Sequence, residues 1–79
     1  TSERISQGSR YGVVALKSGF LIQQGLYSEA RKELLSAAKA DPTEPTLHFL
    51  LGMVYEQAGL VDMAGREFWE AHDLVSRRR

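Results

Sequence analysis

Apolar residues recur every three or four positions through most of this chain, which is the period of an α-helix. A first helix is predicted from Tyr11 to Gln24, because Gly25 is a natural stop after a run of residues with helical spacing. The apolar residues that we expect on one face of this helix are Val13, Val14, Leu16, Phe20 and Leu21.

A second helix is predicted to follow Ser28, whose hydroxyl can cap the first turn, and to end near Asp41. The pair Asp41-Pro42 interrupts it, since proline lacks an amide hydrogen and disfavours helical geometry in the residue before it. Its apolar stripe consists of Ala30, Leu34, Leu35, Ala37 and Ala38.

A third helix is predicted to begin after Thr43, another candidate cap, with Pro45 in its first turn, and to end before Gly59. A fourth runs from about Asp62 to Val75. The turns between these helices are short, so neighbouring helices must run antiparallel. We therefore expect an all-α fold made of two stacked helical hairpins.

The chain also repeats itself at a fixed period and without a gap, so that residues 11–44 align with residues 45–78. Identical residues mark the period, among them Gly25 with Gly59, Leu26 with Leu60, Ala30 with Ala64, and Ala37 with Ala71. Such a period is typical of a solenoid of helical hairpins, whose usual output is a binding surface. We expect one domain over residues 11–79, preceded by a polar, disordered lead or linker over residues 1–10.

These positions resemble a pair of tetratricopeptide repeats. In the second unit the residues at the family's signature positions are Leu51, Gly52, Tyr55, Gly59, Ala64, Phe68 and Ala71. In the first unit they are Ser18, Gly25, Tyr27, Ala30, Ala37, Asp41 and Pro42. The departures from the family's pattern are Lys17, Arg31, Gly65 and Ser76. The resemblance implies an α-α superhelix that binds a protein or peptide in a concave groove.

By the family's register, the first helix of each repeat lines that groove. The residues concerned are Gly12, Ala15, Gly19, Ile22, Gln23, Thr46, Phe49, Met53, Glu56 and Gln57. Phe49 and Met53 lie one helical turn apart and would form an apolar floor, while Gly12 and Gly19 would leave space for a ligand. The patch predicts an apolar or amphipathic peptide as the ligand. The alternative is that these residues pack on residues 1–10 or on a neighbouring repeat.

The fourth helix carries more apolar surface than two hairpins need. Trp69 and Met63 occupy repeat positions that are usually polar. Two repeats are also fewer than the roughly three that a stable solenoid needs. Either the chain is part of a longer array, or copies pair through the exposed end face as a homodimer, unless Trp69 simply packs within its own hairpin. The residues of that predicted self-association face are Met63, Phe68, Trp69 and His72.

Charge and composition exclude several classes of function. Ten basic and ten acidic residues cancel, and the predicted groove holds no lysine or arginine, so we expect no nucleic-acid partner. No apolar run approaches the roughly 20 residues that cross a bilayer. His48 and His72 have no cysteine or nearby histidine as a partner, and we assign no metal, cofactor or catalytic residue. The absence of cysteine fits a reducing compartment such as the cytoplasm.

Overall fold

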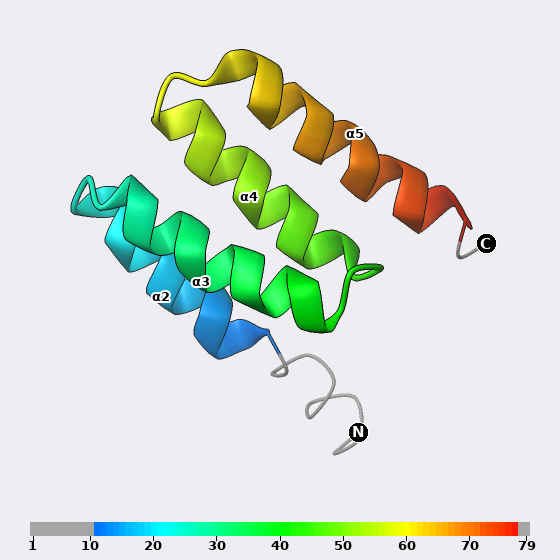
Figure 1. The fold of residues 1–79 in the computed structure, drawn as a ribbon, viewed down its shortest axis with the longest axis horizontal. Coiled ribbons are helices and arrows are strands. Elements are labelled where there is room, and N and C mark those ends of the chain that lie inside the picture. The colour runs from blue at the N-terminus through cyan, green and yellow to red at the C-terminus, as the bar shows by residue number, and fades with distance from the viewer. Residues whose placement is uncertain (1–10, 78–79) are drawn as a thin grey trace.

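Four helices follow one another along the chain as a row of antiparallel neighbours (Figure 1). They are α2 (Gly12–Gln23), α3 (Tyr27–Ala40), α4 (Pro45–Gln57) and α5 (Val61–Arg77), and the computed structural model describes residues 11–77. Within these residues α4 packs between α3 and α5, whereas α2 and α5 lie at opposite ends of the row and do not pack on each other. The predicted all-α pair of hairpins is confirmed. The expectation for residues 1–10 lies outside the described residues.

The turn inside each hairpin has the same geometry. Gly25 and Gly59 adopt φ angles of 76° and 83°, the left-handed region in which a side chain is strained. The amide of Leu26 donates to the carbonyl of Leu21 at 2.8 Å, and the amide of Leu60 donates to the carbonyl of Tyr55 at 2.8 Å. These are the bonds of a Schellman motif, which ends a helix on glycine and satisfies its last carbonyls.

Two predicted helix caps are wrong. The residue before α3 is Leu26, with no side-chain cap, and Ser28 lies inside the helix. α3 begins at Tyr27, directly after the glycine turn, and therefore starts before the residue that was predicted to cap it. At α4 the cap is Glu44 rather than Thr43, since the Glu44 carboxylate accepts the amide of Thr46 at 3.2 Å.

The core is centred on α4, because this helix packs against all three of the other described helices. It contributes five of the eight residues of the buried apolar cluster, which comprises Ala30, Leu34, Leu47, Leu50, Leu51, Val54, Tyr55 and Ala64. Partly buried side chains from the neighbouring helices complete it, including Val14 and Leu21 of α2 and Phe68 of α5. Both hairpins therefore share one core.

Contact between the helices of a hairpin depends on a small residue facing a large one. A Cβ atom added to Gly52 would lie 2.5 Å from the ring of Phe68, closer than side-chain atoms normally approach. Ser18 holds the equivalent position of the first repeat, is fully buried, and its hydroxyl has no hydrogen-bond partner among the described residues. The first hairpin tolerates this larger residue where the position of Phe68 is taken by the smaller Leu34.

The prediction of one apolar face on α2 is wrong, because its apolar residues divide between two faces. Val14 and Leu21 pack against the core. Val13, Leu16 and Phe20 are instead 73%, 78% and 59% exposed. We call these three residues the α2 stripe. Spacings of three and four residues occur between the two sets as well as within them. The sequence pattern therefore assigned to one face residues that the structure places on two.

Polar contacts tie the two helices of each hairpin through equivalent glutamates. In the first hairpin Lys17 Nζ lies 2.9 Å from Glu33 Oε1, and in the second His48 Nδ1 lies 2.9 Å from Glu67 Oε1. The two glutamates occupy the same position in their respective repeats. The Tyr11 hydroxyl also donates to the carboxylate of Asp41, which joins the start of α2 to the end of α3.

Candidate functional site

An apolar groove of about 490 Å³ runs between α4 and α5. It is lined by Pro45, Thr46, Phe49, Phe68, Ala71, His72 and Val75, and we call it the α4/α5 groove. The rings of Phe49 and Phe68 meet in its wall, with centroids 5.5 Å apart and planes tilted by 51°. Aromatic rings in such a tilted contact hold each other's orientation, which gives the groove a defined shape.

The groove joins parts of two sets of residues that the sequence predicted separately. Phe49 comes from the predicted concave groove, while Phe68 and His72 come from the predicted self-association face. Sequence reasoning assigned no role in a binding site to Pro45, Ala71 or Val75.

The remaining residues of the predicted concave groove vary in exposure. Ala15, Ile22 and Met53 are partly buried and pack against the core. Gly12 and Gly19 are partly exposed, and a Cβ atom at either would meet no other atom within 4 Å. The exposed members of this set are Gln23, Thr46, Phe49, Glu56 and Gln57. This face therefore has open space on α2 and one exposed aromatic ring on α4.

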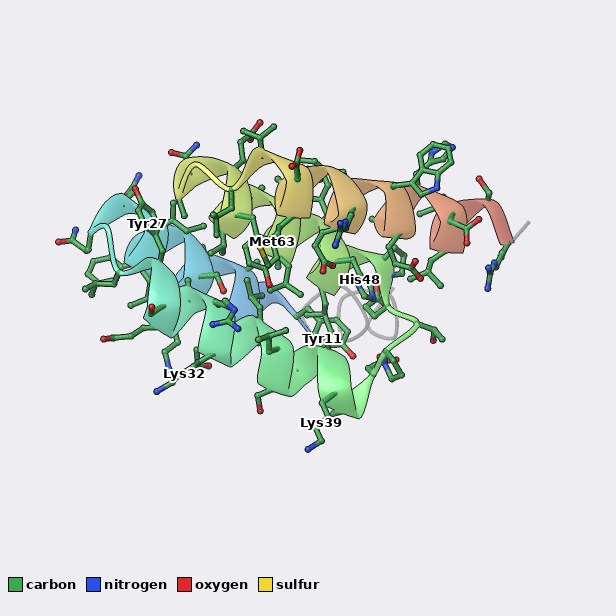
Figure 2. All side chains as sticks on the ribbon, turned by 45° about the horizontal axis from the view of Figure 1, so that its top comes forward. Tyr11, Tyr27, Lys32, Lys39, His48 and Met63 are labelled. Atoms are coloured by element: carbon green, nitrogen blue, oxygen red, sulfur yellow. The ribbon has the colours of Figure 1, made fainter. Side chains whose placement is uncertain are left out.

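The predicted self-association residues do not form one continuous surface. Trp69 is 71% exposed and its ring lies 5.7 Å from that of His72. Met63 is 39% exposed and lines a different hollow, shared with Tyr27 and Arg31 of α3. Figure 2 shows Tyr27 and Met63 on separate helices, with Lys32 and Lys39 extending outward from α3.

The α4/α5 groove has an occupied counterpart elsewhere in the molecule. Moving each lining residue back by one repeat gives Tyr11, Gly12, Ala15, Leu34, Ala37, Ala38 and Asp41. These residues lie on or beside α2 and α3, and α4 packs on both of those helices. Tyr11, Ala15, Ala37 and Ala38 accordingly contact the buried cluster. The first hairpin thus shows what such a groove accepts, which is an apolar helix.

Among the described residues near the groove, His48 is the side chain whose pKa is shifted from its ordinary value. Its Nδ1 lies 2.9 Å from Glu67 Oε1, and its Nε2 lies 2.9 Å from the carbonyl oxygen of Pro42. Only the protonated ring can donate both hydrogen bonds. Burial by itself lowers the pKa of His48, but the bonds to Pro42 and Glu67 and the negative charges of Glu67 and Glu70 outweigh it, so the pKa is raised. Protonated His48 thus links the α3–α4 turn to α5.

Residues 11–77 offer little else for chemistry. No group of three or more histidine, aspartate or glutamate side chains within this range is arranged to hold a metal ion. No helix in the same range has the length and apolar character needed to cross a membrane.

The fold and the groove define a helical-repeat protein. A family model described as TPR repeat matches residues 21–59, which extend from the end of α2 through α3 and α4. The chain belongs to the tetratricopeptide repeat family. Comparison with curated proteins gives no match, and comparison with solved structures gives none either. Repeats of this family generally mediate protein–protein interaction and are not themselves enzymes.

Proposed function

We propose that this chain binds an apolar or amphipathic segment of a partner protein on the concave face of α2 and α4. The observation that carries the proposal is Phe49, which remains 52% exposed although it is a large aromatic side chain in a small domain. Exposed aromatic rings on a firm support are the side chains that most often anchor a partner. Contact with Phe68 supplies that support.

The α2 side of this face supports the same role. Gly12, Ala15 and Gly19 are its small residues, and at both glycines the space beside the helix is open. Glycine lowers helix stability by about 1 kcal/mol relative to alanine. Two such residues on one face allow the backbone or side chains of a ligand to approach α2 closely. The proposed role is binding alone, without a catalytic residue, a cofactor or a nucleic acid.

A displayed library of helical peptides tests the proposal directly. Peptides selected against the wild-type chain are then measured against Gly19→Glu and Phe49→Glu, with Ser36→Glu on the exposed side of α3 as the matched control. Gly19→Glu is suited to this test because its Cβ meets no neighbour and glutamate is the better helix former. Gly19→Glu and Phe49→Glu should each bind the selected peptides about tenfold more weakly or worse, whereas Ser36→Glu should bind them like the wild type.

Circular dichroism first confirms that all four proteins are equally helical. Equal peptide affinity for all four would overturn the proposed concave site. Loss of binding in Ser36→Glu as well would have the same meaning, since it would show that added charge alone weakens the complex.

A second candidate role, self-association through the end of the molecule formed by α5, is favoured by the 71% exposure of Trp69. In its simplest form two α5 faces pair with each other. The arrangement of the two ends of the molecule leads to a more specific version.

A further inference from the structure

Two apolar surfaces of this chain lack a partner among the described residues, and they lie at opposite ends of the row of helices (Figure 1). One is the α2 stripe and the other is the α4/α5 groove. Each surface is equivalent, one repeat away, to one side of a contact within the molecule. The internal contact is the packing of α4 on the first hairpin.

The α2 stripe is the repeat equivalent of the face that α4 uses in that contact. Advancing Val13, Leu16 and Phe20 by one repeat gives Leu47, Leu50 and Val54, which are 0%, 9% and 1% exposed. α4 meets α5 through a different face, since His48 bonds to Glu67 and Gly52 faces Phe68. Val54 lines a hollow with Tyr27 and Arg31 of α3, which places the buried face of α4 against α3. The exposed stripe on α2 is therefore the same surface without its covering helix.

Changes in side-chain size fit the two ends of one molecule to each other. Phe20 is much larger than its equivalent Val54. The α3 residues that share a hollow with Val54 are Tyr27, Ser28 and Arg31. Their equivalents on α5 are Val61, Asp62 and Gly65, of which Val61 and Gly65 are smaller than the residues they replace. A Cβ atom at Gly65 would meet nothing within 4 Å, and Val61 is 71% exposed. The larger ring on α2 thus has additional space to enter on α5.

We propose that copies of this chain stack head to tail, with the α2 stripe of one copy packed against α5 and into the α4/α5 groove of the next. The contact reproduces the packing of α4 on the first hairpin, so the stack continues the internal repeat from one molecule to another. The two surfaces in contact are different, which makes the association open-ended rather than limited to a dimer. The stripe and the concave face are separate sides of α2, so this proposal does not depend on peptide binding at Gly19. Phe49 belongs to both proposed sites because it lines the α4/α5 groove, so Gly19→Glu is the variant that reports on peptide binding alone.

Lys17 should weaken the proposed association. It stands at the repeat position of Leu51, which is 1% exposed in the internal contact. Its ammonium group is bound to Glu33, and its side chain is 55% exposed. Stacking therefore partly covers a charged group, and the association should be weak and reversible. Lys17→Leu restores the apolar residue and should tighten the association about tenfold.

The test measures the mass of the full chain by sedimentation equilibrium from about 1 μM to about 1 mM. The wild type should grow past the mass of a dimer as its concentration rises. Phe20→Glu removes the stripe, and Gly65→Leu fills the space that receives it, so each variant alone should remain a monomer. Both should stay folded, because Phe20 is 59% exposed and leucine is a better helix former than glycine.

Mixing the two variants gives the deciding result. The intact groove of Phe20→Glu can accept the intact stripe of Gly65→Leu, so the mixture should form one-to-one heterodimers and nothing larger. A wild type that stays monomeric overturns the proposal, as does a Phe20→Glu variant that still dimerises through α5. A mixture without heterodimers, or a Lys17→Leu variant no tighter than the wild type, also overturns it. The peptide assay with Gly19→Glu reports on the proposed function independently of all four results.

Discussion

At the scale of single residues, the distance between the helices of a hairpin depends on the pair formed by Gly52 and Phe68. The ring of Phe68 occupies the space where any other residue at position 52 would place its Cβ atom. The first hairpin has Ser18 and Leu34 at the same positions, so it combines a larger residue on one helix with a smaller one on the other. The two hairpins therefore use different pairs of residues at the equivalent position between their helices.

Gly52→Ala should destabilise the fold by about 1–2 kcal/mol, because overpacking outweighs the gain in helix propensity. Adding Phe68→Leu, which imitates the first hairpin, should recover part of that loss. Urea denaturation of the two single variants and the double variant measures the coupling. Strictly additive changes in the free energy of unfolding would show that the two side chains do not compete for the same space.

His48 should make the stability of the second hairpin depend on pH. Its pKa is raised in the folded state, so its stabilising contribution is complete below its ordinary pKa of about 6.5 and is lost as pH rises through the raised value. Wild type should therefore lose on the order of 1 kcal/mol relative to His48→Gln between acidic and alkaline solution. Chemical denaturation across this range measures the difference. A constant difference would contradict the prediction, and Glu67→Gln should reduce the dependence by removing one acceptor.

At the scale of helices and turns, the two glycine turns are the points where the backbone itself requires one residue type. Gly59→Ala should lower the free energy of unfolding by about 1 kcal/mol, since alanine is strained at its positive φ. Gly65→Ala is the matched control inside α5, where the same change should raise stability by roughly 1 kcal/mol. Thermal unfolding of both variants tests the contrast. Shifts in the same direction would show that the turn is not strained by a side chain.

The sequence predicted the number, order and approximate limits of the helices, because glycine turns and Asp41-Pro42 mark their ends clearly. It failed at the caps, since Glu44 competes with Thr43 for the same role and only local geometry selects between them. It also failed on α2, whose apolar residues serve two faces.

The candidate site was predictable only in part. Phe49, Phe68 and His72 could be named from their repeat positions, but not their meeting in one groove, which depends on how α4 and α5 pack. Pro45 and Val75 line it because the ends of two helices come together, and no local pattern in the sequence marks that contact.

At the scale of the whole molecule, stacking should couple stability to concentration. A folded copy that binds another folded copy is stabilised by mass action, whereas an unfolded chain lacks both surfaces. The melting temperature of the wild type should rise by a few degrees between dilute and concentrated solution. Phe20→Glu should melt at one temperature throughout. Scanning calorimetry makes the comparison, and an equal rise in both proteins would contradict the prediction.

The two hairpins also differ in the contacts at the end opposite their glycine turns. Tyr11 and Asp41 close the first by a hydrogen bond, while the equivalent positions of the second carry Pro45 and Val75, whose side chains cannot form one. Amide hydrogens in the last turn of α5 should therefore exchange with solvent faster than those in the last turn of α3, as hydrogen exchange can measure. Equal protection would contradict this difference. Because Pro45 and Val75 line the α4/α5 groove, local opening at this end would widen the groove without breaking a polar contact between them.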